Sequence, residues 1–158
     1  MTRLARFQER INTLIPLTRS LGVTLTAFSG RDIEVHAPLS LNHNHQGTGF
    51  GGSIYAVAVT AAWSLLELWV EDQGLEGEVV IQSGAIDYGQ PLSGDLLARC
   101  SLPGAEDMQR FERSVDRRGI GRLCLESTVY SQDAAGATPA ATFSGRFVVT
   151  VPRSQDQR

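Results

Sequence analysis

The sequence contains little cysteine and no excess of positive charge. Only two cysteines occur in 158 residues, Cys100 and Cys124, and each stands alone in an apolar stretch without CxxC spacing. We expect both to be buried thiols in a reducing compartment, with a disulfide as the alternative. The formal net charge is −3, whereas nucleic-acid binding normally requires a basic face. We therefore expect no nucleic-acid partner.

A continuous hydrophobic run is missing from the first twenty residues. Arginine and glutamate punctuate them, and the small-residue cleavage site of a signal peptide is absent. The one stretch long enough to cross a membrane is 50–70, but Ser53, Thr60, Ser64 and Glu67 interrupt it. We expect a buried central helix there, no membrane partner and a cytoplasmic protein.

The stretch NHNHQGTGFGGS, residues 42–53, lacks the context that its look-alike motifs require. Residues 47–52 fit GxGxxG, but no strand directly precedes them, and no GK[ST] follows for a P-loop. The letters HNH at 43–45 lack the basic surface of a nuclease. His43 and His45 could in principle bind a metal together with His36, but a His-x-His pair on a loop without nearby carboxylates or thiols is weak evidence for a metal site. We expect solvated or locally hydrogen-bonded histidines and no bound metal.

Hydrophobic periodicity predicts a helix, two strands, one long helix and about four more strands. The first helix spans 3–20, with Pro16 making its last turn uncertain, and residues 22–40 form a hairpin. Residues 51–71 are apolar nearly all round, as in a helix wrapped by other structure. The later strands are predicted at 78–92, 95–102, 121–132 and 141–152, the first two joined by the Ser93-Gly94 turn. The polar stretch 104–119 is predicted as a helical turn or an irregular strand start.

Short turns between strands imply an antiparallel sheet, and one enclosed helix implies that the sheet curves around it. Crossover helices between the later strands are missing, which argues against a doubly wound parallel fold. No repeat or linker suggests a second domain. We predict one α+β domain over 1–158, with an N-terminal helix over 1–20, a central helix over 50–72 and a disordered tail at 152–158.

Polar residues and glycines gather where the loop enters the central helix. The first backbone N–H groups of a helix lack internal partners and carry a partial positive charge. Glycines there allow a substrate to approach the backbone closely. Such a mouth suits a developing oxyanion, as when a thioester carbonyl becomes an enolate or a tetrahedral intermediate. Glycines that merely allow a tight passage into the helix are the alternative.

The sequence resembles the hotdog fold, in which a curved antiparallel sheet wraps a central helix. Within that fold it is most similar to the family named for the C-terminal thioesterase-like domain of YiiD. Residues 37–68 carry the resemblance, together with 86–102, which resemble paired strands with an intervening proline turn. The resemblance implies acyl-thioester chemistry on the phosphopantetheine of acyl carrier protein or coenzyme A, with no other cofactor. It also implies a homodimer or a dimer of dimers.

Phenylacetic-acid-type hotdog thioesterases carry Asn-x-x-Gly-x-x-His-Gly-Gly at the corresponding loop. Asn44, Gly47, Gly51 and Gly52 match that pattern, whereas Phe50 stands at the histidine position. The acid that follows in the helix of those enzymes is replaced here by Ala58 or Val59, and the nearest helical acid is Glu67. The residue that would activate water is thus missing from its place.

Hydrolysis requires a general base or a nucleophile, whereas decarboxylation of a malonyl thioester does not. Some members of the YiiD-like family are malonyl-carrier-protein decarboxylases, which supply acetyl thioester for starting fatty acid synthesis. We therefore predict a malonyl-thioester decarboxylase ahead of a thioesterase. A non-catalytic acyl-binding module is the third possibility.

The predicted catalytic residues are Asn44, Gly52 and Ser53. Asn44 would contact the carbonyl or carboxylate, unless it only forms an Asx turn that shapes the loop. Gly51 and Gly52 would lend N–H groups to the oxyanion. Ser53 would bind the carboxylate or cap the helix. The predicted substrate-binding residues are Asn42, Thr48, Phe50, Gly51, Asp87, Tyr88, Arg117 and Arg118.

Three further sets of residues are candidates for contact with the substrate or its carrier. By resemblance, Asp87 and Tyr88 border the site, and Asp87 is the one nearby acid that could serve a hydrolase. The arginines of 113–122 could steer an acidic carrier protein or the phosphates of coenzyme A, or form a solvated turn. Tyr55, Trp63 and Trp69 could fill the core or line an acyl pocket.

Overall fold

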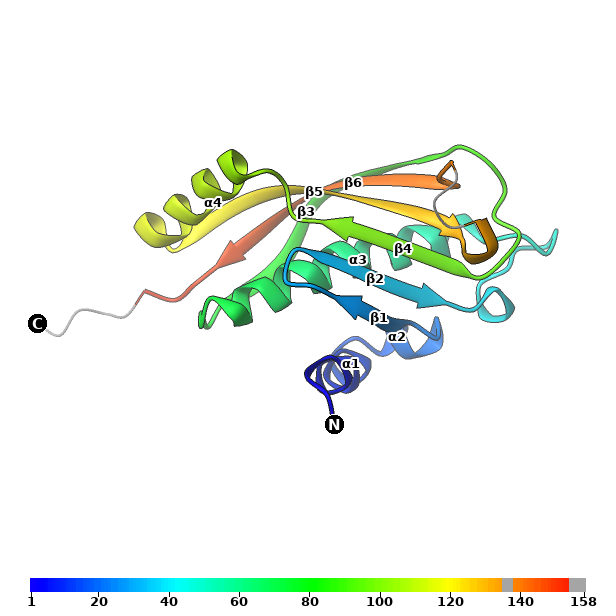
Figure 1. The fold of residues 1–158 in the computed structure, drawn as a ribbon, viewed down its shortest axis with the longest axis horizontal. Helices are drawn as coiled ribbons and strands as arrows, with labels where there is room; N and C mark the ends of the chain where they lie inside the picture. Colours follow the sequence, from blue (N-terminus) through cyan, green and yellow to red (C-terminus); the bar gives the residue numbers. More distant parts are fainter. Residues whose placement is uncertain (135–137, 154–158) are drawn as a thin grey trace, which may run out of the picture.

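A six-stranded antiparallel sheet curves around one long helix in the computed structural model, which describes residues 1–134 and 138–153 (Figure 1). The strand order is β1-β2-β4-β5-β6-β3, and every neighbouring pair is antiparallel. This arrangement confirms the predicted α+β hotdog architecture. The elements are α1 (Arg3–Leu14), α2 (Pro16–Ser20), β1 (Thr24–Phe28), β2 (Asp32–Ala37), η1 (Leu39–Leu41), α3 (Gly51–Asp72), β3 (Glu78–Tyr88), β4 (Leu96–Ser101), α4 (Ala105–Arg118), β5 (Ile120–Ser131), η2 (Gln132–Ala134) and β6 (Ala141–Thr150).

Helix α3 is the centre of the core. Most of its side chains are buried against the sheet, so this helix, although long and apolar enough to span a bilayer, packs inside the protein. One face is different, because its residues are partly exposed at helical spacing. We call this face the open stripe; it consists of Gly52, Tyr55, Ala56, Val59, Thr60 and Trp63.

Large and small residues alternate in the core beneath the open stripe. Phe143 and Phe147 of β6 are fully buried, and the ring of Phe143 packs edge-on against Tyr55, with ring centroids 5.3 Å apart. Gly84 and Gly145 make room for Phe143, since a Cβ at either position would collide with its ring. A residue with a side chain at position 84 or 145 would therefore displace this ring.

The N-terminal segment forms two helices instead of the single predicted helix. Ile15 has φ −125° and ψ 82°, because a residue that precedes proline is pushed out of the helical region. Pro16 then starts α2 at the first helical position, where its missing N–H costs nothing. The prediction of one helix over 3–20 was therefore wrong at residue 15.

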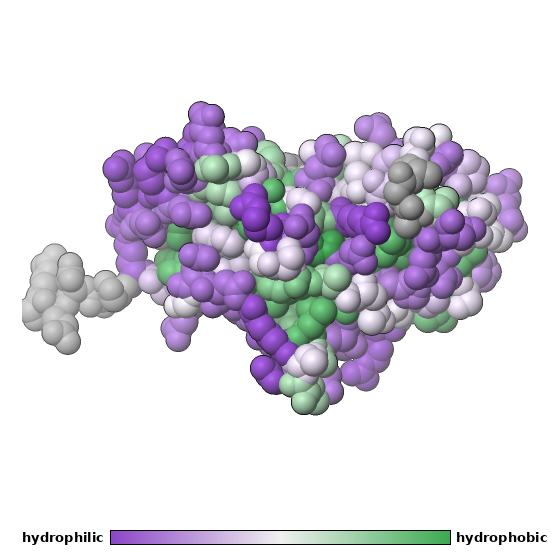
Figure 2. Space-filling view, in the orientation of Figure 1, coloured by the Kyte–Doolittle hydropathy of each residue, from purple (hydrophilic) through white to green (hydrophobic). Residues whose placement is uncertain are grey.

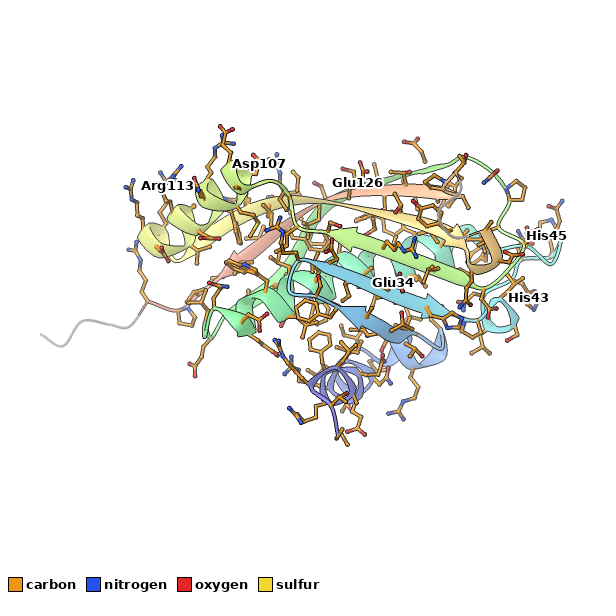
Figure 3. All side chains as sticks on the ribbon, in the orientation of Figure 1. Glu34, His43, His45, Asp107, Arg113 and Glu126 are labelled. Atoms are coloured by element: carbon orange, nitrogen blue, oxygen red, sulfur yellow. The ribbon has the colours of Figure 1, made fainter. Side chains whose placement is uncertain are left out.

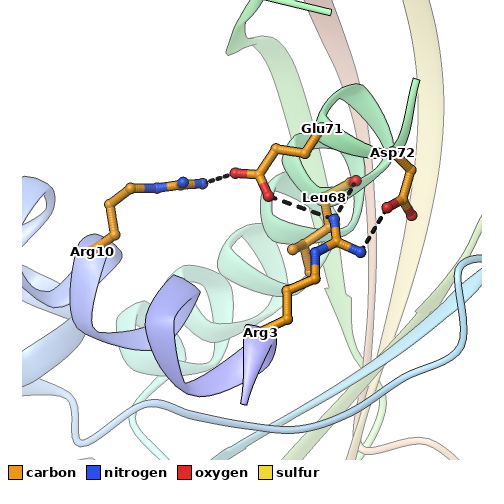
Figure 4. Close-up of polar contacts among 5 residues, drawn as sticks. All are labelled: Arg3, Arg10, Leu68, Glu71 and Asp72. Carbon is orange, nitrogen blue, oxygen red and sulfur yellow. Dashed lines mark hydrogen bonds and ion pairs between the residues drawn. The ribbon is translucent and has the colours of Figure 1, made fainter. Parts of the chain in front are cut away.

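Arginines fasten α1 to the end of α3 (Figure 4). Arg3 donates to the carbonyl oxygen of Leu68 at 3.1 Å and pairs with Asp72 at 2.6 Å, while Arg10 pairs with Glu71. Exposed ion pairs of this kind contribute little stability individually. Their effect here is positional, because they hold α1 and α2 along one side of α3.

Strands β3 and β4 are not neighbours, so the predicted pairing of 78–92 with 95–102 was wrong. Strand β3 is at the edge of the sheet and pairs with β6, whereas β4 lies between β2 and β5. The Ser93-Gly94 turn belongs to a segment, residues 89–95, that crosses the end of the sheet from one strand to the other. A local pattern of two strands and a turn does not distinguish a hairpin from such a crossing.

The polar stretch 104–119 is a complete helix, α4, and not the predicted turn. Met108, Phe111 and Val115 recur at helical spacing and are buried. Gly119 ends the helix with φ +70°, as is common for a C-terminal glycine. Phe111 packs on Trp69 of α3 with ring centroids 5.3 Å apart, which joins α4 to the end of the core and assigns Trp69 to that core.

Both cysteines are free thiols, but only one is buried. Burial raises the pKa of Cys100 to about 11, so this thiol stays protonated and inert. Cys124 is exposed because it occupies an outward position of β5, and its predicted burial was wrong. The predicted tail at 152–158 falls mainly on residues 154–158, which lie outside the described part.

Candidate functional site

Residues 42–50 fold into a narrow loop that delivers the chain to the start of α3. The backbone N–H of Phe50 donates to the carbonyl of Asn42, and that of Asn44 donates to Thr48, both at 2.7 Å. Gly47 turns the loop with φ +77°, a conformation that side chains other than glycine rarely adopt. The loop conformation therefore explains the glycine at position 47 without any contact to a substrate.

The crossing segment after β3 holds this loop in place from the other side. The carbonyl of Leu92 accepts a hydrogen bond from Gly49 N–H at 2.7 Å, and Leu92 is itself buried. The hydroxyl of Tyr88 donates to the carbonyl of Gly51 at 2.7 Å. Two segments far apart in the sequence thus fix the entrance to the helix, which we call the mouth: residues 42–53 together with Tyr88.

The N-terminus of α3 is open at the mouth. Its N-cap residue is Phe50, which offers no side-chain oxygen, and its first turn contains no acidic residue. Ile54 N–H is bonded to Phe50 at 2.9 Å, so the N–H groups of Gly51, Gly52 and Ser53 precede the helical ladder. These three amides lie at the positive end of a 22-residue helix and are donors of the kind that bind a negatively charged oxygen.

Phe50 and Gly52 form the outer wall of the mouth. The Phe50 side chain is 54% exposed, which is unusual for so large an apolar group. A Cβ at Gly52 would approach Cε1 of the Phe50 ring to 2.6 Å, so the ring lies directly over this glycine. Gly52 is exposed, and its backbone is therefore accessible beside an apolar ring.

Asn44 lies in the mouth, but its side chain is committed to the loop. Its Oδ1 accepts from the N–H groups of Gln46 at 2.9 Å and Thr48 at 3.1 Å, which is an Asx turn. Its Nδ2 donates to Thr48 Oγ1 at 2.9 Å and more weakly to Gly49 O at 3.4 Å. The geometry shows the loop-shaping alternative for Asn44, with Thr48 as its partner in the loop, while direct contact of either residue with a substrate stays a prediction.

Replacing Asn44 separates these two roles. Asn44→Ala removes the Asx-turn acceptor, and we expect hydrogen exchange at Gln46 and Thr48 to accelerate about fivefold, since each amide loses a bond of about 1 kcal/mol. Asn44→Asp keeps the acceptor and is expected to retain the protection. If Asn44→Ala kept normal exchange rates but lost turnover, the amide would act on the substrate and not on the loop.

Asn42 and Ser53 are buried and do not face the open mouth. Asn42 donates to the carbonyls of Leu21 and Pro38, both at 2.8 Å, and thereby anchors the loop to the end of α2. Ser53 is on the sheet-facing side of α3 and is 8% exposed. It is not the N-cap, so the capping role proposed for it was wrong. Substrate contacts by either side chain remain predictions that this geometry does not favour.

Of the two β3 residues, only Tyr88 reaches the mouth. Successive strand residues point to opposite faces, so Asp87 lies on the face away from Gly51. Desolvation, and to a lesser degree Tyr55, raises the pKa of Tyr88, which keeps its hydroxyl protonated as a donor. Glu67, the nearest helical acid, lies fifteen residues beyond Gly52, roughly 22 Å along the helix.

The predicted arginines lie at the opposite end of the molecule. Figure 3 labels Arg113 on α4 at the left and His43 and His45 at the right-hand tip, and Arg117 and Arg118 are in the last turn of α4. Figure 2 shows hydrophilic side chains covering the α4 region. Within one chain, Arg117 and Arg118 are therefore far from the mouth, because they belong to helix α4, which the sequence pattern did not predict.

The histidines have separate partners. His36 Nε2 is 3.1 Å from Asp95 Oδ2, and His43 Nδ1 is 3.0 Å from the carbonyl of Asn44. Within residues 1–134 and 138–153, no group of three histidine, cysteine or acidic side chains could hold a metal ion.

Asp95 is a supporting residue that the sequence pattern did not reveal. Its Oδ1 accepts from Leu39 N–H at 2.8 Å, and its other oxygen contacts His36. The Leu39 amide, and then His36, lower the pKa of Asp95. A carboxyl group whose pKa is lower in the folded state stabilises the fold at pH values above its unfolded-state pKa. The stabilisation by Asp95 is therefore lost as the pH falls through its folded-state pKa.

We therefore expect Asp95→Ala to lower the free energy of unfolding at pH 7 by about 1 kcal/mol or less, since the group is partly exposed. The difference from the parent protein should shrink as the pH falls below the ordinary Asp value of 3.8. Urea titrations between pH 7 and pH 3 measure this, with the exposed Glu126→Ala as the control. A difference that is constant over this range would contradict the assignment.

The fold and the mouth define a class of protein: a hotdog domain with an open helix N-terminus next to paired glycines. The sequence model of one family, described as "Putative thioesterase (yiiD_Cterm)", matches residues 4–151. The chain belongs to this YiiD C-terminal family.

Solved structures share the fold over nearly the whole chain. A protein of unknown function from Chlorobaculum tepidum has 25% identity and a TM-score of 0.87, covering 92% of this chain and 93% of that one. A protein from Shewanella oneidensis, named a "putative thioesterase", has 24% identity and a TM-score of 0.81, with 94% and 97% covered. A thioesterase from Haemophilus influenzae has 17% identity and a TM-score of 0.71, with 99% and 96% covered.

Proposed function

We propose that this protein acts on an acyl thioester whose carbonyl oxygen binds the amides at the start of α3. The observation that carries the proposal is the uncapped N-terminus of α3, with Gly52 exposed beside it. Membership of a thioesterase-like family supports the same class of substrate. The acyl group would be carried on the phosphopantetheine of acyl carrier protein or coenzyme A, in the cytoplasm.

Within this class we propose decarboxylation of a malonyl thioester to the acetyl thioester, which would serve to start fatty acid synthesis. The bond between the malonyl carboxylate and C2 breaks, carbon dioxide leaves, and the electron pair forms an enolate whose oxygen is bound by the Gly51 and Gly52 amides. A proton from water then gives the acetyl thioester. Preorganised donors that bind a developing oxyanion stabilise the transition state without further reorganisation.

This reaction needs no general base, and the two acidic side chains that the sequence offered for that role, Asp87 and Glu67, are not placed to act as one. Asp87 points to the other face of β3, and Glu67 lies far along α3. Phe50, at the position where related thioesterases carry histidine, contributes an apolar wall that can exclude water from the carboxylate. An apolar wall beside a leaving carboxylate favours loss of charge.

Hydrolysis of the thioester is the second candidate. It is favoured by the similar structures from Shewanella oneidensis and Haemophilus influenzae, which are named as thioesterases. In that reaction the same amides would bind the tetrahedral oxyanion. The two reactions are distinguished by incubating the protein with a malonyl carrier protein and measuring the mass of the carrier. Decarboxylation keeps the thioester, whereas hydrolysis releases the free thiol. A protein that only binds acyl groups would change neither.

We also propose a homodimer formed through β3. This eleven-residue strand is at the edge of the sheet, and Val80, Ile81 and Tyr88 on it are between 40% and 57% exposed. An unpaired edge with apolar side chains is a template for another strand. Two copies related by a two-fold axis would pair their β3 strands antiparallel, so that each mouth lies next to the second copy.

A further inference from the structure

A groove of about 280 Å³ lies between α2 and the open stripe of α3. Leu17 and Leu21 form one wall, and Ala56, Val59 and Trp63 form the other. The ion pairs of Arg3 and Arg10 with the end of α3 position α1 (Figure 4), and α2, which carries the first wall, follows α1 directly in the chain. The groove is thus a built feature that depends on the N-terminal helices.

The lining is chemically suited to hydrocarbon. Its two threonine hydroxyls are already used internally, because Thr18 donates to Asn12 at 2.9 Å and Thr60 donates to the Ala56 carbonyl at 2.7 Å. Tyr55 also lines the groove, but its hydroxyl lies against Gly84 of β3. No charged side chain is among the lining residues. A peptide or a nucleotide would find few partners there, whereas an alkyl chain requires none.

The groove begins one turn beyond the mouth and runs in one direction. Gly52, Ala56, Val59 and Trp63 recur at spacings of four, three and four and therefore share one face of α3. The stretch from Ala56 to Trp63 is roughly 10 Å long at about 1.5 Å per residue. A chain attached to a carbonyl at Gly52 can therefore enter the groove directly.

Trp63 closes the far end. Its indole N–H donates to the Val79 carbonyl at 2.8 Å, and its ring packs on Phe7 with centroids 6.2 Å apart. Both contacts fix the ring. The next residue on the same face is Glu67, so the surface beyond the ring becomes polar.

We propose that this groove binds the alkyl chain of a medium-length acyl thioester. The inference rests on the proposed thioester site, but not on which of the two reactions follows. In a decarboxylation, malonyl itself has no chain and would leave the groove empty, whereas 2-alkylmalonyl thioesters would be further substrates that fill it. In a hydrolysis, the substrate would be a fatty acyl thioester. The volume accommodates roughly eight or nine methylene groups, if each fills the ~30 Å³ that a water molecule occupies in the liquid.

Titration calorimetry with S-alkyl-coenzyme A thioethers tests the groove without any turnover, because a thioether can be neither hydrolysed nor decarboxylated. We expect Kd to fall about twofold per methylene, since an open groove covers roughly half of the chain. The fall should stop near eight or nine carbons. Equal Kd values for the ethyl and the decyl thioether would overturn the proposal.

Two substitutions place the chain in this groove. Ala56→Trp and the milder Val59→Phe should both flatten the dependence of Kd on chain length, because they fill the space between α2 and α3. Ser144→Trp introduces the same bulk as Ala56→Trp on an exposed position of β6 and should leave the dependence unchanged. If the filling variants changed only the oligomeric state, a second copy and not an alkyl chain would occupy the groove, and the proposal would fail.

The two proposals fail separately. Chain-length-dependent thioether binding without turnover of any thioester would retain the groove and reject the proposed reaction. Turnover of malonyl thioester with no dependence of thioether binding on chain length would retain the proposed reaction and reject the groove.

Discussion

Replacing Gly52 by aspartate is expected to lower kcat/KM for a malonyl thioester by at least about 100-fold while the protein remains folded. A carboxylate in the first turn would occupy the positive end of α3 and repel the malonyl carboxylate and the enolate. Loss of a single oxyanion donor costs about 100- to 1,000-fold in well-studied enzymes, and the added charge opposes several donors at once. The fold should tolerate the change, because an acidic residue near a helix N-terminus is favourable.

The matched control is Gly52→Asn, which has the same size without the charge. Both side chains must displace the tip of the Phe50 ring, so the steric effect is shared. We expect the asparagine variant to lose about tenfold, and thermal denaturation to show both variants folded. An aspartate variant within threefold of the parent protein would mean that the thioester carbonyl does not bind at this helix end.

Replacing Phe143 by alanine is expected to lower the free energy of unfolding by about 3–5 kcal/mol. The ring is fully buried and is enclosed by Gly84, Gly145 and the edge of Tyr55, none of which can expand into the space it would leave. The loss therefore includes a cavity as well as the transfer of the ring. Urea denaturation followed by tryptophan fluorescence measures the difference.

Ser144→Ala, at the next and exposed position of β6, is the control and should change stability by no more than about 0.5 kcal/mol. A Phe143→Ala protein that lost less than about 1.5 kcal/mol would show that the sheet relaxes around the site. The packing described here between β6, the two glycines and α3 would then be incorrect.

The central helix was predictable because its signal is local. Residues 51–71 are apolar on nearly every face, and the observed helix is Gly51–Asp72. The hairpin of β1 and β2 was predictable for the same reason, since alternation and a Ser-Gly turn are contained in one short stretch. Helix α4 was missed although Met108, Phe111 and Val115 have helical spacing, because its many charged residues hide a narrow apolar stripe.

Properties that depend on distant contacts could not be predicted. The neighbours of β3 are decided by how the sheet closes around α3, and alternation within β3 contains no information about them. The position of Arg117 and Arg118 follows from α4, and the burial of Asn42 follows from the carbonyls of Leu21, just after α2, and of Pro38, just before η1. Asn44 was correctly placed in the mouth, but only the structure shows that its amide holds the loop.

The mouth itself combines both kinds of information. The glycine pair at 51–52 and the missing acid in the helix were visible in the sequence, and together with the family resemblance they predicted a thioester site without a hydrolytic base. The bracing of this mouth by Tyr88 and Leu92 required the tertiary structure. The proposed chemistry therefore rests on residues that local sequence reveals and on a geometry that it does not.

The most direct test is to incubate the protein with a malonyl acyl carrier protein and to follow the mass of the carrier protein. The account predicts loss of carbon dioxide with the acetyl thioester intact, and much slower conversion by Gly52→Asp. Release of the free phosphopantetheine thiol would show that the reaction is hydrolysis and not decarboxylation. No change with malonyl or longer acyl thioesters would contradict a catalytic role for the mouth.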